Sequence, residues 1–329
     1  MNILSKSVFS LMIGFVLAIV LGTIIIPYLK KRAYQRLSIY LDEKHSSKKG
    51  TPTMGGIIFI ISTIITILIF FLTNKISFNI HLLIVILTFL GYALIGFIDD
   101  YLIIKNNNNK GLSEKSKLFM QLLIAIAFFY LFIKSGNEPL LWIHSLNIKI
   151  AMGWLYGVLI LFILLASSNA VNITDGLDGL ATGLSIISFL TFGIITWNTG
   201  WLDGYESIAI FCFILSGSLI GFLFFNSNPA KIFMGDTGSL ALGATLGSIA
   251  ILTRHEILLV LIGIVFVLET LSCLIQRFYY KLTHKRVFPM TPIHHTFEKM
   301  GMNEREIVKL FWVIGFVGSL LALCYGVWL

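Results

Sequence analysis

The chain has 329 residues, of which 57% are hydrophobic and only 12% are charged. Soluble domains carry about 45–50% apolar and about 25% charged residues, so this composition excludes a soluble globular protein. The formal charge of +8 therefore bears first on membrane topology and does not indicate nucleic-acid binding. The three cysteines stand singly in apolar segments, without the spacing of a disulfide framework or a zinc site.

Ten segments are apolar over the ~20 residues that a membrane-spanning helix needs. We predict spans at roughly 7–29, 55–73, 79–98, 118–133, 152–168, 177–198, 207–225, 237–253, 257–276 and 307–328. They predict an all-α, polytopic membrane protein with a single integral-membrane domain over residues 1–329. No cleavage site follows Pro27, so the first span is expected to be a retained anchor.

Lysine and arginine are distributed unevenly between the two sides of the predicted bundle. Of the 24 basic residues, 18 lie in the loops that follow odd-numbered spans. Because basic loops remain in the cytoplasm, these loops are predicted to be cytoplasmic and both termini extracytoplasmic. Five polar clusters lie on this cytoplasmic face.

The first two clusters surround the second and third spans. KKGTPTMGG (48–56) offers Lys49 and Thr53 to a phosphate at a helix start, although a topological anchor also explains the lysines. GFIDDY (96–101) places Asp99 and Asp100 at the expected end of span 3, where adjacent carboxylates repel each other and oppose the helix dipole. Successive helix positions differ by ~100°, so we expect one carboxylate to reach the reacting groups and the other to hold a lysine. A solvated pair is the alternative.

The third cluster, SNAVNITDGLDG (168–179), is expected to form the whole connection between spans 5 and 6. Asn169 and Asn172, like Asp175 and Asp178, are three residues apart and would share one side of a helical turn. Helix capping explains one of these side chains but not all four. Such a loop indicates a polar ligand.

The fourth and fifth clusters precede spans 8 and 10. FNSNPAKIFMGDTGS (225–239) sets Asp236 at a helix start, which suits either Mg²⁺ shared with phosphate oxygens or a plain N-cap, and offers Phe233 to a planar base. FPMTPIHHTFE (288–298) carries His294 and His295 without zinc-ligand spacing, so phosphate contact or proton transfer is favoured. Upstream, Glu269 and Gln276 lie in span 9, where an ionisable residue is a functional candidate.

In this order, the five clusters resemble the phospho-N-acetylmuramoyl-pentapeptide transferases, a branch of the polyprenyl-phosphate N-acetylhexosamine-1-phosphate transferases, over nearly the whole chain. The resemblance implies transfer of phospho-MurNAc-pentapeptide from its UDP carrier to undecaprenyl phosphate, giving lipid I and UMP with Mg²⁺. It implies a multi-pass protein of the bacterial cytoplasmic membrane, partnered by the two substrates and the lipid bilayer, and leaves a homodimer open. We expect a single displacement in which Asp99 aligns or deprotonates the acceptor.

The resemblance also implies roles for individual residues. Asp236 would be the Mg²⁺ ligand, with Asp99 and Asn172 as further candidates. The implied catalytic set is Asp99, Asp100, Asp236 and His294. The implied substrate-binding set is Lys49, Thr53, Lys110, Lys115, Asn169, Asn172, Asp175, Gly176, Leu177, Asp178, Asn226, Phe233, Gly235, Ser239, Gln276 and His295.

Two positions depart from the family pattern. Thr296 stands where the family usually has a third consecutive histidine, and Ile103 stands where many members have a lysine. Two other functions stay open: a sister enzyme using UDP-GlcNAc, and a transporter. The run GTPTMGG and the histidine pair favour the pentapeptide branch, while the apolar spans and the absence of a repeat disfavour transport.

Overall fold

The computed structural model describes residues 3–32, 50–106, 111–143, 146–198, 202 and 204–328. The longer helices are α1 (Ile3–Lys30), α2 (Gly56–Leu72), α3 (Ile80–Asn106), α4 (Glu114–Lys134), α5 (Leu155–Thr174), α6 (Leu180–Asn198), α7 (Tyr205–Asn226), α8 (Gly235–Leu252), α10 (Ile264–Thr283) and α12 (Glu304–Leu323). The short helices are α9 (Leu258–Ile262), α11 (Ile293–Lys299) and a π-helical turn, η3 (Cys324–Trp328). One antiparallel hairpin joins β1 (Leu140–Ile143) to β2 (Ile148–Ala151).

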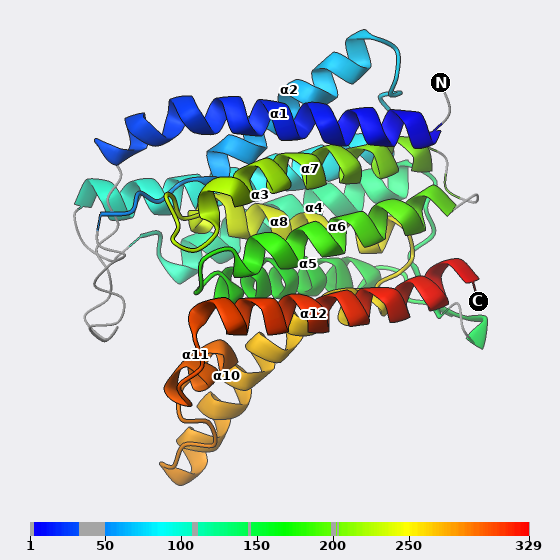
Figure 1. Ribbon diagram of the computed structural model, residues 1–329. Coiled ribbons are helices and arrows are strands. Elements are labelled where there is room, and N and C mark those ends of the chain that lie inside the picture. The colour runs from blue at the N-terminus through cyan, green and yellow to red at the C-terminus, as the bar shows by residue number, and fades with distance from the viewer. Residues whose placement is uncertain are drawn as a thin grey trace.

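Most long helices lie side by side in one bundle, with α8 inside it (Figure 1). Every residue of α8 from position 237 to 252 is buried, so this helix needs no lipid-facing apolar surface and tolerates many Gly, Ser and Thr residues. On α1, the buried stripe is built from small residues four apart, Ser10, Gly14, Ala18 and Gly22, which allow α7 to approach closely. Helix α10 leaves the bundle at an angle and is followed by α11 (Figure 1).

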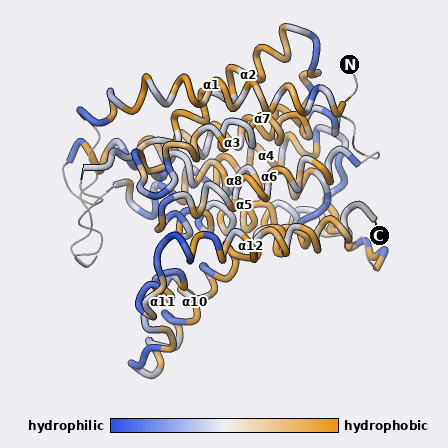
Figure 2. Tube along the Cα trace, in the orientation of Figure 1, coloured by the Kyte–Doolittle hydropathy of each residue, from blue (hydrophilic) through white to orange (hydrophobic). Residues whose placement is uncertain are grey.

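The polytopic membrane character predicted from the sequence is confirmed in its general form. Seven of the described helices are long and apolar enough to cross a membrane, namely α1, α3, α4, α5, α6, α7 and residues 304–326. Helix α2 is apolar but shorter, with 17 residues. Hydrophobic residues fill the helix middles, and the hydrophilic ones gather at the helix ends and around α11 (Figure 2). Each of the ten predicted spans coincides with helix.

Three predicted boundaries were wrong. The ninth span is two helices, because the chain breaks at Gly263, which has poor helix propensity and non-helical dihedral angles. Helix α3 continues past Asp99 and Asp100 to Asn106, so the pair does not end a helix. Helix α5 continues to Thr174, so only residues 175–179 connect it to α6. In both cases polar residues extend a helix beyond its apolar stretch, which a hydropathy criterion misses.

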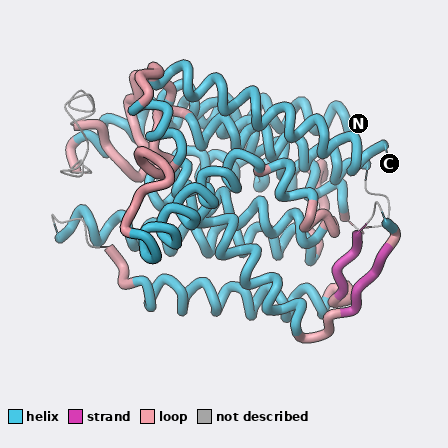
Figure 3. The backbone as a smooth tube through the Cα atoms, turned by 90° about the horizontal axis from the view of Figure 1, so that it is seen from below, coloured by secondary structure: helices cyan, strands magenta, loops and turns pink. Residues whose placement is uncertain are grey.

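The all-α prediction is corrected by the β1–β2 hairpin, in which Leu140 pairs with Ala151 and Ile143 with Ile148. Its aromatic and β-branched residues favour strands, and Asn147 adopts a positive φ of 51° at the turn. The hairpin lies at the end of the bundle that carries both termini, away from most of the long loops (Figure 3).

A buried charged cluster anchors this hairpin. The Arg254 guanidinium donates hydrogen bonds to the carbonyl oxygens of Glu138 (2.6 Å) and Leu140 (2.9 Å) and to the Tyr156 hydroxyl (3.2 Å). The Tyr156 hydroxyl in turn donates to Glu256, and burial raises the pKa of the Glu256 carboxyl to about 7, although that hydrogen bond opposes the shift. The cluster therefore ties the hairpin to the loop between α8 and α9.

Candidate active site

Two carboxylates from different helices converge on one lysine ammonium. Lys117 Nζ, in the first turns of α4, lies 2.8 Å from Asp99 Oδ2 on α3 and 3.1 Å from Asp236 Oδ2 at the start of α8. The other Asp99 oxygen accepts the Leu112 N–H at 2.6 Å. Asp99 is buried, whereas the Asp236 side chain is 26% exposed, so the cluster opens to the surface at Asp236. One positive charge thus holds two negative charges together.

Asp100 points to the N-terminus of α8 instead. Its Oδ2 accepts the Thr237 N–H (2.9 Å) and the Thr237 hydroxyl (2.6 Å), and its Oδ1 accepts the Asp236 N–H (3.2 Å). A carboxylate at a helix N-terminus is stabilised by the unpaired N–H groups and the dipole there. The adjacent aspartates therefore diverge, as the ~100° step predicted, but the lysine is held by Asp99. The sequence predicted that this pair would oppose the dipole of its own helix. Asp100 instead lies at the N-terminus of α8, where the helix dipole favours a carboxylate.

Two glycines allow this close approach of α3 and α8. A Cβ at Gly96 would clash with the Asp236 carbonyl oxygen, so α3 packs here against backbone. Gly235 has a φ of +74°, and a Cβ there would lie 2.6 Å from Asp100 Oδ2 and 2.8 Å from the hydroxyl of Thr53. Thr53 is buried beside Gly235, inside the protein. The site depends on both positions lacking a side chain.

Asn172 completes the polar set around Asp236. Its amide nitrogen donates to Asp236 Oδ1 (2.8 Å) and to the Ser239 hydroxyl (2.9 Å). Asn169, one turn earlier on α5, is exposed and donates to the Leu165 carbonyl oxygen at 2.8 Å. The two asparagines are both helical, as their spacing predicted, but only Asn172 contacts the carboxylate cluster.

The connection from α5 to α6 is held by its second aspartate. Asp178 is buried; its Oδ2 accepts the Asn228 side-chain amide (3.2 Å) and the Ala230 N–H (3.0 Å). Its own backbone N–H donates to Glu304 at the start of α12 (2.8 Å). Asp178 therefore links its own connection to the loop between α7 and α8 and to the start of α12. Leu177 is also buried, whereas Asp175 is half-buried and Gly176 is exposed. Asp175 and Gly176 thus lie nearer the surface than the two residues that follow them.

The loop between α7 and α8 is shaped by Asn226, which is buried. It accepts the Thr182 hydroxyl at 2.6 Å and donates to the Ile232 carbonyl oxygen at 3.0 Å. The next residue, Phe233, is fixed through its backbone, with its N–H on the Pro52 carbonyl oxygen (2.8 Å). Its ring is half-buried, next to the start of α8. Asn226 is thus a loop-shaping residue, and Phe233 remains a candidate contact for a base.

The histidine motif forms the start of α11. His294 is fully buried, with Nδ1 3.1 Å from Glu269 Oε2, and its ring lies 4.2 Å from that of His295. His295 Nδ1 pairs with Glu298 at 2.5 Å. Thr296, which stands at the departing position, donates its hydroxyl to the Met290 carbonyl oxygen. This hydroxyl therefore stabilises the turn before α11.

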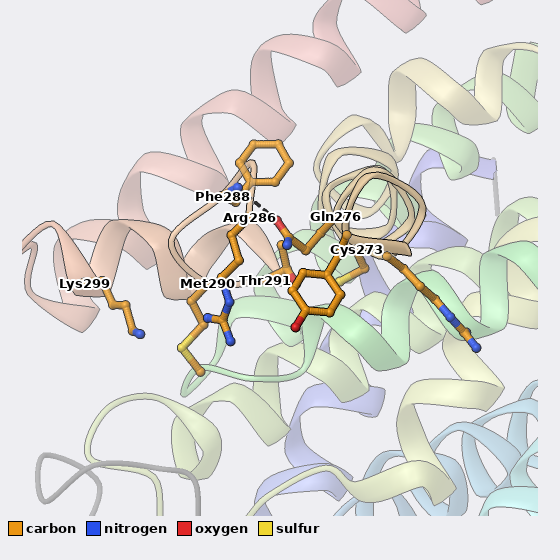
Figure 4. Close-up of a pocket in the computed structure, with 9 residues that line it drawn as sticks. Cys273, Gln276, Arg286, Phe288, Met290, Thr291 and Lys299 are labelled. Atoms are coloured by element: carbon orange, nitrogen blue, oxygen red, sulfur yellow. Dashed lines mark hydrogen bonds between the residues drawn. The ribbon is translucent and has the colours of Figure 1, made fainter. Parts of the chain in front are cut away.

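Gln276 of α10 holds the same segment. Its Oε1 accepts the N–H groups of Val287 and Phe288, each at 3.0 Å, the second of which is seen in Figure 4. A pocket of about 550 Å³ opens here, and its lining is basic and aromatic: Cys273, Gln276, Arg277, Tyr280, Arg286, Phe288, Met290, Thr291 and Lys299.

The structure describes one of the three expected lysines. Lys49 and Lys110 lie outside the described residues, and Lys115 is exposed. Sequence reasoning missed Lys117, although a signal existed. Lys117 lies four residues before Gln121, which begins the buried stripe of α4, whereas Lys115 is off that face.

The donor set fits a hard divalent cation better than zinc. Among the described residues, no group of three or more His, Cys, Asp or Glu side chains could hold a metal. Mg²⁺ typically takes only one or two carboxylates and completes its shell with water and substrate phosphate. The carboxylates of Asp99 and Asp236, which already converge on a cation, match that requirement.

The chain is similar to known proteins over nearly its whole length. The family model described as glycosyl transferase family 4 matches residues 80–254, and phospho-N-acetylmuramoyl-pentapeptide-transferase signature 1 matches residues 48–60. A protein of that transferase name from Shouchella clausii is 42% identical over 98% of both chains. One from Bacillus thuringiensis is 44% identical over 96% of this chain and 97% of its own. The chain therefore belongs to the phospho-N-acetylmuramoyl-pentapeptide-transferase family.

Proposed function

We propose that this protein transfers phospho-MurNAc-pentapeptide from UDP-MurNAc-pentapeptide to undecaprenyl phosphate, forming lipid I and UMP. The proposal rests on the 41–44% identity to relatives of that name over nearly the whole chain. The geometry of Asp99, Lys117 and Asp236 supports it, because phosphoryl transfer gains mainly from positioning and charge neutralisation. The relatives' names favour this donor over UDP-GlcNAc.

In the proposed reaction, an oxygen of the acceptor phosphate attacks the β-phosphorus of the nucleotide sugar. The bond from that phosphorus to the bridging oxygen breaks, and UMP leaves with the electron pair. A phosphate monoester has a second pKa of ~6, so the acceptor is largely dianionic at neutral pH. Asp99 then aligns the acceptor and takes any remaining proton, in a single displacement. Lys117 offsets the negative charge that gathers around the two carboxylates.

The same carboxylates would hold Mg²⁺, with Asn172 as a neighbouring oxygen donor after rotation of its amide. Bound there, Mg²⁺ would supply charge neutralisation of the pyrophosphate. Asp100 acts differently in this proposal. It positions Asp236 by capping α8 and does not touch substrate. Asp175, Gly176, Phe233 and Ser239 remain candidate contacts for the nucleotide sugar.

The lipid substrate requires an apolar surface near this polar site. Helix α10 exposes Leu271, Leu274, Ile275 and Phe278 along its outer side. Each methylene kept from water contributes ~0.8 kcal/mol, so such a surface would retain the acceptor's tail.

The orientation of the chain is part of the proposal. The connections that hold Asp178 and Asp236 follow odd-numbered predicted spans, and the loops after odd-numbered spans together carry 18 of the 24 basic residues. We therefore place this end in the cytoplasm of a bacterium and both termini outside, with ten spans of one domain. A C-terminal reporter enzyme that is active only outside the cytoplasm tests this placement, and an inactive but well-expressed fusion would contradict it.

The function is tested with the purified full chain in nanodiscs. We expect UMP release and a lipid-linked product with UDP-MurNAc-pentapeptide, undecaprenyl phosphate and Mg²⁺, and neither product with UDP-GlcNAc. Asp236→Asn and Asp99→Asn should lose activity, while Glu114→Gln, an exposed carboxylate near the same face, should keep it. Binding of Mn²⁺, followed by electron paramagnetic resonance, should weaken in Asp236→Asn. Full activity of Asp236→Asn would overturn the metal assignment, and a covalent sugar-phosphate adduct formed without acceptor would overturn the single displacement.

A further inference from the structure

A fully buried carboxylate lies in the second turn of α10. Glu269 has no solvent exposure, and neither does His294, the residue that faces it from α11. Glu269 Oε2 lies 3.1 Å from the Nδ1 of His294 and 3.4 Å from its backbone nitrogen, which donates to it. This side-chain contact is close, but its direction departs from the straight line that a hydrogen bond prefers.

This carboxylate is costly for the fold. Burying an ionisable group destabilises the fold unless hydrogen bonds or an opposite charge compensate, and an apolar side chain of similar size often serves stability as well. Glu269 Oε1 has no hydrogen-bond partner among the described residues. Packing does not explain the choice of glutamate at this position, whereas a role toward His294 does.

The opposite edge of the His294 ring faces the connection between α5 and α6. A Cβ at Gly176 would clash with the Nε2 atom of His294, so only a glycine allows the ring to approach the backbone there. Gly176 is exposed and follows Asp175, in the loop proposed to meet the nucleotide sugar. The buried His294 ring therefore lies between the Glu269 carboxylate and the backbone of a candidate substrate loop.

We propose that Glu269 is a positioning residue that acts through His294. Its carboxylate holds the Nδ1–H tautomer of the imidazole, which leaves the Nε2 lone pair directed to the loop at Gly176. Because Nε2 is buried, the ring acts on the bound donor through this loop, whose backbone it supports at Gly176. A carboxylate that fixes the tautomer and orientation of a histidine is the arrangement of many acid–base sites. The expected change in kcat rests on the proposed transfer, whereas the tautomer of His294 does not depend on it.

Three variants test the contact kinetically. Glu269→Leu removes the acceptor and suits the apolar surroundings, and we expect kcat to fall about 10- to 100-fold with the donor KM within about twofold. Glu269→Gln keeps an acceptor oxygen and should retain most of the activity. In a His294→Ala background, Glu269→Leu should cause no further loss, because the two residues act as one unit. Losses that add in the double variant, or equal losses for Leu and Gln, would overturn the proposal.

A spectroscopic measurement separates this inference from the proposed function. The chain labelled with ¹⁵N-histidine in nanodiscs should show the Nδ1–H tautomer for the signal that disappears in His294→Ala. That signal should change to the Nε2–H tautomer in Glu269→Leu, which a purely structural role would not produce. An unchanged tautomer would overturn the inference even if the transferase is active, whereas a wild-type chain without transferase activity would overturn only the function.

Discussion

Asp100→Asn should destabilise the protein as well as inactivate it, because Asp100 caps α8. Its two oxygens accept three hydrogen bonds from Asp236 and Thr237. An asparagine presents one oxygen and one NH₂ group, so at least one N–H of α8 faces a donor. Leaving that buried N–H without an acceptor costs about 1–3 kcal/mol.

This cost lowers the free energy of unfolding by about 1–3 kcal/mol. For a chain of this size that corresponds to a decrease in Tm of roughly 1–4 °C. Thermal unfolding in detergent, followed by fluorescence or calorimetry, measures it. The activity should fall in parallel, because Asp236 begins the uncapped helix.

Asp99→Asn is the matched control. The new side chain keeps an oxygen for the Leu112 N–H, and Lys117 keeps Asp236 as a partner, so the Tm should change little while kcat collapses. A wild-type Tm for Asp100→Asn, with activity lost as in Asp99→Asn, would refute the capping role and indicate direct contact of Asp100 with substrate.

Three further predictions concern single positions. Lys117→Met should lower kcat about 100-fold or more in the UMP-release assay. Lys134→Met, exposed at the other end of the same helix, should not, and equal activities would contradict the role of the shared ammonium. Gly235→Ala should lower the Tm more than Gly301→Ala. Both positions have positive φ, which costs an alanine about 1–2 kcal/mol, but only at Gly235 would the Cβ also lie 2.6 Å from a carboxylate oxygen. Equal decreases in Tm would show that this steric clash contributes nothing. Burial raises the pKa of the Glu256 carboxyl from 4.5 to about 7, so its protonated form favours the fold and up to about 3 kcal/mol of stability is lost as the pH rises from about 4.5 through 7. Glu256→Gln should flatten the dependence of Tm on pH over that range, and a slope identical to that of the wild type would show that Glu256 does not titrate there.

The helical membrane architecture could be predicted from the sequence, because an apolar span is recognised from residues that are close together in the chain. Each predicted span coincides with helix, and Asp236 lies at the start of α8 as expected. The errors came where polar residues continue a helix, as at Asp99 and Asn172. Hydropathy reports on what faces lipid, and it carries no information about a helix that extends beyond the apolar layer or that is buried by its neighbours.

The partners of individual side chains depended on the tertiary structure. The separate roles of Asp99 and Asp100 follow from the ~100° step between them, but the identity of each partner depends on how α3, α4 and α8 cross. Asn226 and Asp178, predicted to line the substrate site, also hold loops in place through partners from distant segments, which the sequence did not indicate.

By itself, the sequence determined a strongly apolar chain, its helical spans, the face on which its polar clusters gather and the family that those clusters resemble. Each of these depends on residues that are close in the sequence. Only the tertiary structure decided that Lys117 unites Asp99 with Asp236, that Asp100 caps α8, and that Glu269 faces His294. These contacts join residues 18 to 137 positions apart, and long-range packing alone fixes which of them meet.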